Sequence, residues 1–393
     1  MPTWWPIPIA VVFFLSALFT DAVRALALRF GVVDAPSEPR KQHGRTVPLL
    51  GGVAIFAAFT LVTVTVLLLS DHFTQGEITT RHFIGFFLGG FVLMIGGVLD
   101  DRYRLPAKVM IWFAIAASLS AVFVGGIGVS KITNPFGDPF LVADTVSNVL
   151  TLVWLMCMIY TTKLLDGLDG LATGVSAIGA LMITLLALSA AFYQPDVALL
   201  ALIVFATLLG FLVWNLPPAA IFLGEFGSTF VGYLIGVLAV ISGSKVATAL
   251  LVVGIPALDV LFVLLRRWRA GHPLFTSSDR QHLHFLLKRI GFKDRQILAM
   301  YYLFAFGFGV TTVFFESWQK LIALGILFII MLMTAVRLSS VTETYETTTH
   351  HSCPYGKCSC RDSSGVSCCN AKGNADVHVS ECANQGACCQ RPD

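Results

Sequence analysis

Charged residues are scarce in this sequence: Asp, Glu, Lys and Arg together make up 12% of the 393 residues, whereas soluble proteins hold about 25%. Hydrophobic residues make up 56%, above the usual range of about 45–50%. This balance excludes an ordinary soluble domain and indicates an integral membrane protein. The net charge is only +3 and no basic run is interleaved with aromatics, so we expect no nucleic-acid partner.

Cysteine is almost absent from the first 349 residues, where Cys157 stands alone. The same part shows no internal repeat and no secretory cleavage pattern, so we interpret its first apolar segment as a retained membrane helix. The other eight of the nine cysteines fall in the last segment, which holds almost no aliphatic residues. We therefore predict three parts: a transmembrane domain at 1–338, a linker at 339–349 and a cysteine-rich tail at 350–393.

Long apolar runs follow one another through the first part of the chain. With roughly 20 residues per span, they predict an all-α polytopic membrane protein with about eleven transmembrane helices. The expected spans are 5–27, 48–70, 82–99, 107–129, 146–163, 170–192, 196–214, 227–243, 246–265, 297–315 and 319–337.

Lys and Arg are unevenly divided between the two sets of loops, which predicts the orientation because cytoplasmic loops carry the excess. The poorer set holds only Arg81, Lys131, Lys245 and Lys320. The richer set carries every polar motif described below. We therefore expect the N-terminus outside, the C-terminus in the cytoplasm and the motifs on the cytoplasmic face.

Two adjacent carboxylates, Asp100 and Asp101, close the third apolar run. Side by side at a membrane edge they repel each other, unless a cation or phosphate chemistry uses them. Neighbours at a helix end point about 100° apart, so one can meet a metal and the other a substrate or a base partner. Arg102 and Lys108 follow as partners or as phosphate ligands. The alternative is a pair of solvated loop carboxylates.

A second acidic motif lies between two apolar runs. Asp166 and Asp169 share a face if the segment is helical, whereas Gly167 and Gly170 beside them favour a loop in which a ligand approaches the backbone. Lys163, just before the motif, is either a phosphate ligand or an interface anchor.

A third motif runs from Asn215 through Pro217 and Pro218 to Gly224-Glu225-Phe-Gly-Ser228. It predicts a flexible, donor-rich turn. Glu225 is a candidate ligand for Mg²⁺, which takes one or two carboxylates together with water and phosphate oxygens.

A single acid, Asp259, falls inside the ninth expected span. An ionisable residue within the membrane is a functional candidate, although Ser or backbone partners would give it a structural role.

Two loops supply cations. The first has a basic cluster before a helix start at Pro48-Leu-Leu-Gly51-Gly52, which indicates either an anion site or positive-inside charge with a turn. Its members are Arg40, Lys41, His43 and Arg45. The second loop contains Asp279, Arg280, His282 and His284. Histidines two apart do not share a helical face, so phosphate binding is favoured over a zinc site.

Taken together and in this order, the motifs resemble the polyprenyl-phosphate N-acetylhexosamine-1-phosphate transferase superfamily. They are closer to the branch that uses GlcNAc-1-phosphate than to the MurNAc-pentapeptide branch. The resemblance covers about residues 30–295. It rests on Arg40-Lys41-x-His43…Gly51-Gly52, Asp100-Asp101-Arg102…Leu105-Pro106-x-Lys108, Asp166-Gly-x-Asp169-Gly-Leu-Ala, Asn215…Pro218-Ala219…Gly224…Gly227-Ser228 and Asp279-Arg280-x-His282-x-His284.

Three departures from the family pattern, at four positions, stand out. Tyr160 and Lys163 stand where the family usually shows two asparagines, Glu225 replaces an aspartate, and Phe285 replaces the last histidine of the histidine-rich loop.

The resemblance implies a plasma (inner) membrane enzyme with a cytoplasmic-face site, a UDP-sugar donor, a polyprenyl-phosphate acceptor, and Mg²⁺ or alternatively Mn²⁺. It would carry out the first membrane step of lipid-linked glycan or cell-wall polymer synthesis and release UMP. The expected catalytic residues are Asp100, Asp101, Asp169, Lys108, His282 and His284. The expected substrate-binding residues are Lys41, His43, Lys163, Asp166, Asn215 and Arg280. The expected metal ligands are Glu225 and one of Asp100 and Asp101.

Three other functions are weighed against this one: a transporter, a CDP-alcohol phosphotransferase and a phospho-N-acetylmuramoyl-pentapeptide transferase. A transporter would hold its charges near the bilayer midplane, whereas the motifs of this chain are expected on the cytoplasmic face. A CDP-alcohol enzyme needs Ala-Arg after its first Asp-Gly, where this chain has Leu168-Asp169.

In the tail, clustered thiols in a reducing compartment indicate Zn²⁺ or Cu⁺ binding, the alternative being an appendage without a role in transfer. A homodimer is compatible with the sequence.

Overall fold

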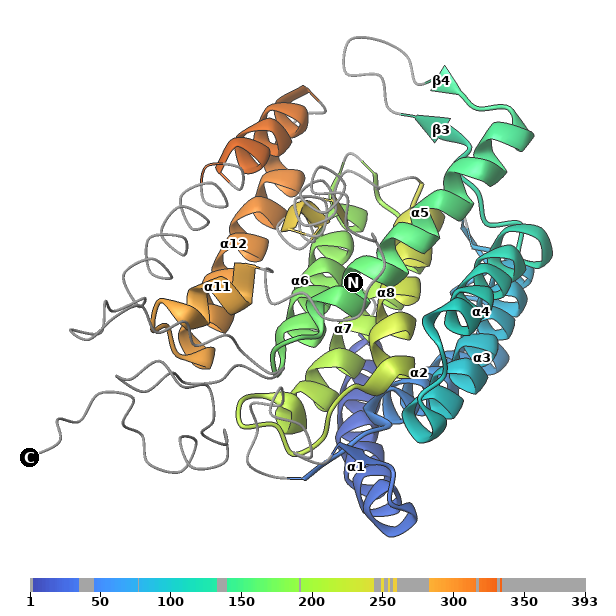
Figure 1. Ribbon diagram of the computed structural model, residues 1–393. Coiled ribbons are helices and arrows are strands. Elements are labelled where there is room, and N and C mark those ends of the chain that lie inside the picture. The colour runs from blue at the N-terminus through green and yellow to red at the C-terminus, as the bar shows by residue number, and fades with distance from the viewer. Residues whose placement is uncertain are drawn as a thin grey trace, which may run out of the picture. The chain divides into compact units, whose positions relative to one another are not determined.

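The computed structural model describes residues 3–34, 46–76, 78–132, 140–190, 192–243, 249–250, 254, 257–259, 283–315, 318–330 and 333 (Figure 1). The chain divides into two compact units, Met1–Leu332 and Met333–Asp393, and the description that follows concerns the first. Several predicted features lie outside the described residues: Lys41, His43, Arg280, His282, most of the expected span at 246–265, and the cysteine-rich tail.

The first unit is built almost entirely of helices. Their bounds are α1 Pro6–Phe30, α2 Gly51–Leu69, α3 Thr80–Tyr103, α4 Ala107–Leu119 continued by the π-helical turn η1 Ser120–Val124, α5 Asp144–Leu165, α6 Leu171–Ala187, α7 Pro195–Asn215, α8 Gly224–Ile241, α11 Leu283–Arg289 and α12 Asp294–Phe314. Two antiparallel pairs of two-residue strands complete it, β1 Val33–Asp34 with β2 Val47–Pro48 and β3 Lys131–Ile132 with β4 Phe140–Leu141.

The prediction of an all-α polytopic membrane protein is confirmed. Among the described residues, 8 helices are long and apolar enough to cross a membrane, and each coincides with an expected span. Two more expected spans appear as shorter apolar helices, α6 with 17 residues and Trp318–Ile330. A helix rises about 1.5 Å per residue, so α6 falls short of the roughly 30 Å of a bilayer core.

Helix α8 is the centre of the bundle, where it contacts α2, α3, α5, α6 and α7 (Figure 1). Glycine makes these contacts close: a Cβ at Gly52 of α2 would overlap the backbone of Gly227, and a Cβ at Gly97 of α3 would overlap Phe226. Helices in lipid associate through such close packing, since the surrounding tails are as apolar as their side chains. The glycines therefore hold the start of α8 in a fixed place.

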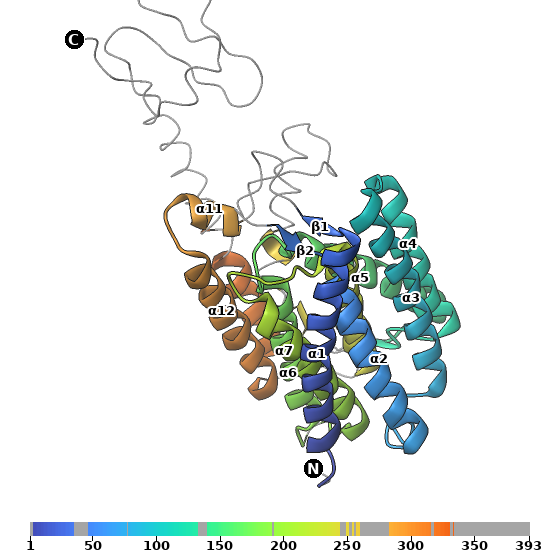
Figure 2. The same cartoon turned by 90° about the horizontal axis from the view of Figure 1, so that it is seen from below.

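The helix ends that carry the polar motifs meet at one end of the bundle. Helices α3, α5 and α7 end there, and α2, α6 and α8 begin there, as their mutual hydrogen bonds show. The β1–β2 pair lies at the same end, beyond the last turn of α1 (Figure 2).

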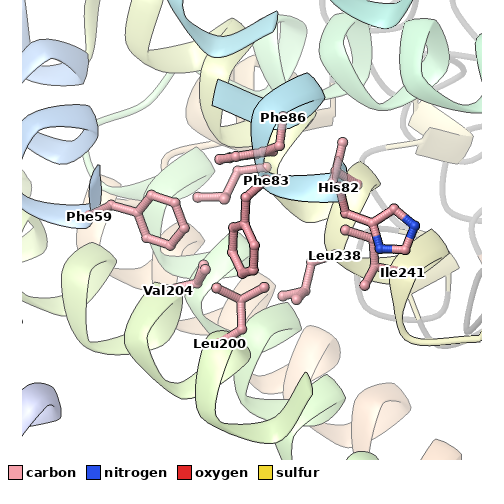
Figure 3. Close-up of a pocket in the computed structure, with 10 residues that line it drawn as sticks. Phe59, His82, Phe83, Phe86, Leu200, Val204, Leu238 and Ile241 are labelled. Carbon is pink, nitrogen blue, oxygen red and sulfur yellow. The ribbon is translucent and has the colours of Figure 1, made fainter. Parts of the chain in front are cut away.

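A small apolar cavity lies toward the opposite end, where α3 and α7 begin and α8 ends (Figure 3). Its volume is about 20 Å³, and its lining includes Phe59, Phe83, Phe86, Leu200 and Leu238. This space suits a single water molecule at most. The polar end is therefore the better candidate for the functional site.

Candidate active site

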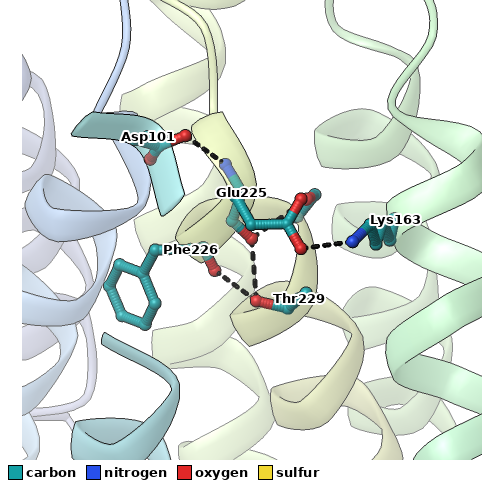
Figure 4. A network of polar contacts seen from close by, with 6 residues as sticks. Asp101, Lys163, Glu225, Phe226 and Thr229 are labelled. Atoms are coloured by element: carbon teal, nitrogen blue, oxygen red, sulfur yellow. Dashed lines mark hydrogen bonds and ion pairs between the residues drawn. The ribbon is translucent and has the colours of Figure 1, made fainter. Parts of the chain in front are cut away.

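The core of the polar end is the contact between Asp101, in the last turn of α3, and Glu225, in the first turn of α8. The backbone N–H of Glu225 donates a hydrogen bond of 2.8 Å to Oδ1 of Asp101 (Figure 4). A carboxylate at a helix N-terminus is favoured by the unpaired N–H groups there. Gly224 makes room for it: its φ is +75°, and a Cβ would lie 2.5 Å from Oδ2 of Asp101.

Lys163, in the last turn of α5, forms an ion pair with the Glu225 carboxylate (Figure 4). The side chains are 27% and 13% exposed respectively, so water screens the pair only in part. Lys163 also lies 5.9 Å above the ring of Tyr160, which is within cation–π range. Lys163 and Glu225, which both depart from the family pattern, are therefore in direct contact.

Asp100, the neighbour of Asp101 on α3, has a different hydrogen-bond partner from it. Its carboxylate accepts a hydrogen bond from the backbone N–H of Leu105 and lies within electrostatic range of Lys163. Arg102 and Lys108 are exposed on either side of the turn between α3 and α4. Lys163, which the sequence does not pair with Asp100, therefore lies close to it, while the expected partners Arg102 and Lys108 lie at the surface.

The segment from Asp166 to Gly170 is a turn between α5 and α6, so the helical alternative for this motif is wrong. Gly170, with φ +77°, reverses the chain. Oδ2 of Asp169 accepts a hydrogen bond of 2.9 Å from the backbone N–H of Ala219. Burial, and then the charges of Asp169, Glu225 and Asp101, raise the pKa of Asp166 well above its usual value. The acidic motifs therefore converge on one place.

Asn215, the last residue of α7, joins the loops of this site. Its Oδ1 accepts hydrogen bonds of 3.1 Å from the backbone N–H of Gly170 and from the hydroxyl of Thr173. Its Nδ2 donates one of 3.0 Å to the carbonyl of Ile221. The side chain is 2% exposed and fixes the acidic turn to the loop before α8.

Helix α12 supplies two contacts that the sequence does not reveal. The hydroxyl of Tyr302 donates 2.7 Å to the carbonyl of Gly170, and the guanidinium of Arg295 donates 3.2 and 3.1 Å to the carbonyl of Pro217. The sequence contains only a weak signal for Arg295, which reads as one more positive-inside charge. Both side chains hold the same two loops as Asn215.

Helix α11 places His284 against the acidic turn. His284 is 3% exposed, and a Cβ at Gly167 would lie 2.5 Å from its Nε2. The backbone N–H of Leu283 donates a 2.9 Å hydrogen bond to Oδ1 of the buried Asp259. The alternative of a backbone partner for Asp259 is thus confirmed, and this acid anchors the start of α11.

The start of α2 does not offer free donors to an anion. The N–H groups of Gly51 and Gly52 donate to the carbonyls of Phe222 and Leu223 at 3.0 and 2.9 Å, because α2 packs directly on the loop before α8. The backbone part of the predicted anion site is therefore wrong. The prediction of a flexible turn at Glu225 is wrong as well, since α8 already begins at Gly224.

The donor set at this end fits Mg²⁺. Oδ2 of Asp101 is buried and has no hydrogen-bond partner among the described residues, and the charges of Asp101, Asp169 and Glu225 all reach Asp166. In the described part of the chain, no group of three or more His, Cys, Asp and Glu side chains is placed so that it could hold a metal ion by itself. Mg²⁺ is usually held by one or two carboxylates together with water and phosphate oxygens, and such a site needs no closed cage.

Comparison with known proteins agrees with the residues assembled here. Residues 83–243, which include the acidic motifs of α3, α5 and α8, match the model of glycosyl transferase family 4. The chain is 32% identical to a probable undecaprenyl-phosphate N-acetylglucosaminyl 1-phosphate transferase of Bacillus subtilis, over 86% of this chain and 95% of that protein. It is 32% identical to a decaprenyl-phosphate N-acetylglucosaminephosphotransferase of Mycolicibacterium smegmatis, over 81% and 84%. It is 28% identical to an undecaprenyl-phosphate alpha-N-acetylglucosaminyl 1-phosphate transferase of Escherichia coli K12, over 74% and 78%.

Proposed function

Because this chain belongs to glycosyl transferase family 4, we propose that it transfers a sugar-1-phosphate, GlcNAc-1-phosphate in the first place, from a UDP-sugar to a membrane polyprenyl phosphate. The observation that carries the proposal is the match to the Bacillus subtilis protein over 95% of that protein's length. The convergence of Asp101, Asp166, Asp169 and Glu225 at one bundle end supports it, because phosphoryl transfer depends on positioning and on charge.

In the proposed reaction an oxygen of the polyprenyl phosphate attacks the sugar-bearing phosphorus of the donor. The new P–O bond replaces the bond to the nucleotide phosphate, which leaves as UMP. A phosphate monoester is largely ionised at pH 7, so Asp100 or Asp101 has mainly to orient the acceptor and take up its remaining proton.

We propose that Glu225 and one of Asp100 and Asp101 hold Mg²⁺, with Mn²⁺ as an alternative. When bound, the ion would neutralise charge on the donor pyrophosphate. Asp166 and Asp169 would face the nucleoside or the metal, with Asp169 already fixed by the backbone of Ala219. The remaining expected residues would contact the donor phosphates: Lys41, His43, Lys108, Lys163, Arg280, His282 and His284.

Asn215 then acts as a positioning residue, since its oxygen and one N–H already bind the protein. We further propose that the polar end faces the cytoplasm of a plasma membrane. The asymmetry of Lys and Arg between the two sets of loops supports this orientation.

The proposed function is tested with purified protein, a polyprenyl phosphate and a panel of UDP-sugars. We expect release of UMP and formation of a lipid-linked sugar pyrophosphate with UDP-GlcNAc, and loss of both when the acceptor is omitted or EDTA is added. If no UDP-sugar releases UMP in an acceptor-dependent way, the proposal fails. Release of CMP from a CDP-alcohol would favour the rival phosphotransferase.

A truncation tests whether the tail belongs to the enzyme. None of the membrane motifs contains a thiol, so a chain ending at Leu338 should keep at least about half of the transfer rate, as a catalytic core that folds independently would. It should also lose any Zn²⁺ or Cu⁺, because thiolate clusters bind soft metals. Elemental analysis of both proteins measures this. Equal metal content would refute a tail cluster, and loss of transfer would make the tail part of the enzyme.

A further inference from the structure

The ion pair between Lys163 and Glu225 places an ammonium group inside a cluster of carboxylates. Lys163 lies within electrostatic range of Asp100 as well as in contact with Glu225, and the charges of Glu225 and Asp101 both reach Asp166. In the described part of the chain, Lys163 is the cation that forms an ion pair within this cluster. The protein therefore partly neutralises its own acidic site with this ammonium.

The pair is held by rigid elements. Helices α5 and α8 pack closely near the pair, where a Cβ at Gly232 would overlap the backbone of Met158. One turn further on, the indole of Trp154 donates a hydrogen bond of 2.9 Å to the carbonyl of Gly236. Because Lys163 and Glu225 sit on two helices locked in this way, the fold itself brings the ammonium and the carboxylate together.

Glu225 is held from its backbone as well. Its N–H is bound to Asp101, and its carbonyl accepts a hydrogen bond of 2.8 Å from the hydroxyl of Thr229. Only the end of its side chain is left to change partner. A divalent cation that binds this carboxylate must displace the ammonium or accept a like charge a few ångströms away, and in a partly buried site that repulsion is weakly screened.

We propose that Lys163 is a resident counter-ion that competes with the divalent cation for Glu225 and thereby lowers the affinity of the site for metal in the absence of substrate. The inference rests on the proposed function only in taking Glu225 as a metal ligand. An ammonium displaced by the metal is free to turn to a phosphate oxygen, which is an exchange of one anionic partner for another. Metal binding to this chain is therefore weak without substrate and strengthened by it.

The test measures binding of Mn²⁺ alone, by the electron paramagnetic resonance signal of the free ion, with Mg²⁺ as competitor. Lys163→Met keeps an unbranched side chain only one atom shorter and removes the charge, so the dissociation constant for Mn²⁺ should fall at least about 10-fold. Lys163→Arg keeps the charge and should leave it near the value of the unchanged protein.

A matched control and a double variant complete the design. Lys288→Met removes an ammonium paired at 2.8 Å with Asp294, which is not an expected metal ligand, and should change Mn²⁺ binding by no more than about 2-fold. In a Glu225→Gln background the effect of Lys163→Met should vanish, because the two residues act on one carboxylate.

The opposite results are equally clear. If Lys163→Met is folded, as judged by its melting temperature, and binds Mn²⁺ no tighter than the unchanged protein, Lys163 serves only to join α5 to α8. Absence of Mn²⁺ binding in every variant would also overturn the inference. Because this assay contains no substrate, its failure is separate from failure of the UMP-release assay.

Discussion

Asp101→Asn is expected to lower the rate of sugar-phosphate transfer by at least about 100-fold while leaving the fold intact. The amide can keep the 2.8 Å contact with the N–H of Glu225 through its oxygen. The second atom, however, changes from a buried carboxylate oxygen into an NH₂ group that binds neither a metal nor a proton. Loss of the favourable interaction with the start of α8, about 0.3–1 kcal/mol, is offset in part by reduced repulsion from the neighbouring carboxylates. Steady-state UMP release and thermal unfolding in detergent measure the two effects.

Asp100→Asn and Glu225→Gln are expected to cause losses of similar size, because each removes one anionic ligand or base from the same place. Asp144→Asn is the matched control: it neutralises a carboxylate in the first turn of α5, at the opposite end of that helix from Lys163. It should keep nearly the full rate. Near-normal turnover of all three site variants with Mg²⁺ present would show that the site is assigned wrongly.

The helices could be predicted from the sequence because a membrane span has a simple requirement, about 20 apolar residues with few charges. Errors fall where a helix begins with polar residues. Helix α8 starts at Gly224 and not near 227, because Asp101 and the close packing at Gly52 stabilise a first turn that contains Glu225. Both stabilising groups are far away in the sequence, so no local pattern indicates this start.

The same limit applies to the site. The acidic motifs can be recognised because they are charged residues in an apolar sequence, but the residues that contact them cannot be recognised in this way. Lys163 and Glu225 are 62 residues apart, and Tyr302 is 132 residues from Gly170. A tyrosine within an apolar span or a lysine at its end is ordinary in membrane helices. Only the packing of α5, α8 and α12 turns these residues into parts of the site.

Asn215→Leu is expected to reduce transfer at least about 100-fold by displacing the acidic turn, since small misplacements of catalytic groups are costly. The leucine has a similar size but leaves the N–H of Gly170 and the carbonyl of Ile221 without their partner. Each such buried group costs about 1–3 kcal/mol, so we expect a loss of about 2–6 kcal/mol in the free energy of unfolding. Thermal unfolding together with steady-state kinetics in UDP-GlcNAc measures both.

Thr173→Val separates these effects, because it removes one hydrogen bond to Asn215 and leaves the link between Gly170 and Ile221 in place. It should cost about 1 kcal/mol and keep the rate within about 10-fold. Mn²⁺ binding gives a further distinction: Asp101 and Glu225 do not depend on Asn215 for their contact, so Asn215→Leu should still bind the ion. A folded Asn215→Leu protein that retains full turnover would contradict a positioning role, and one that loses Mn²⁺ binding would place Asn215 in the metal site itself.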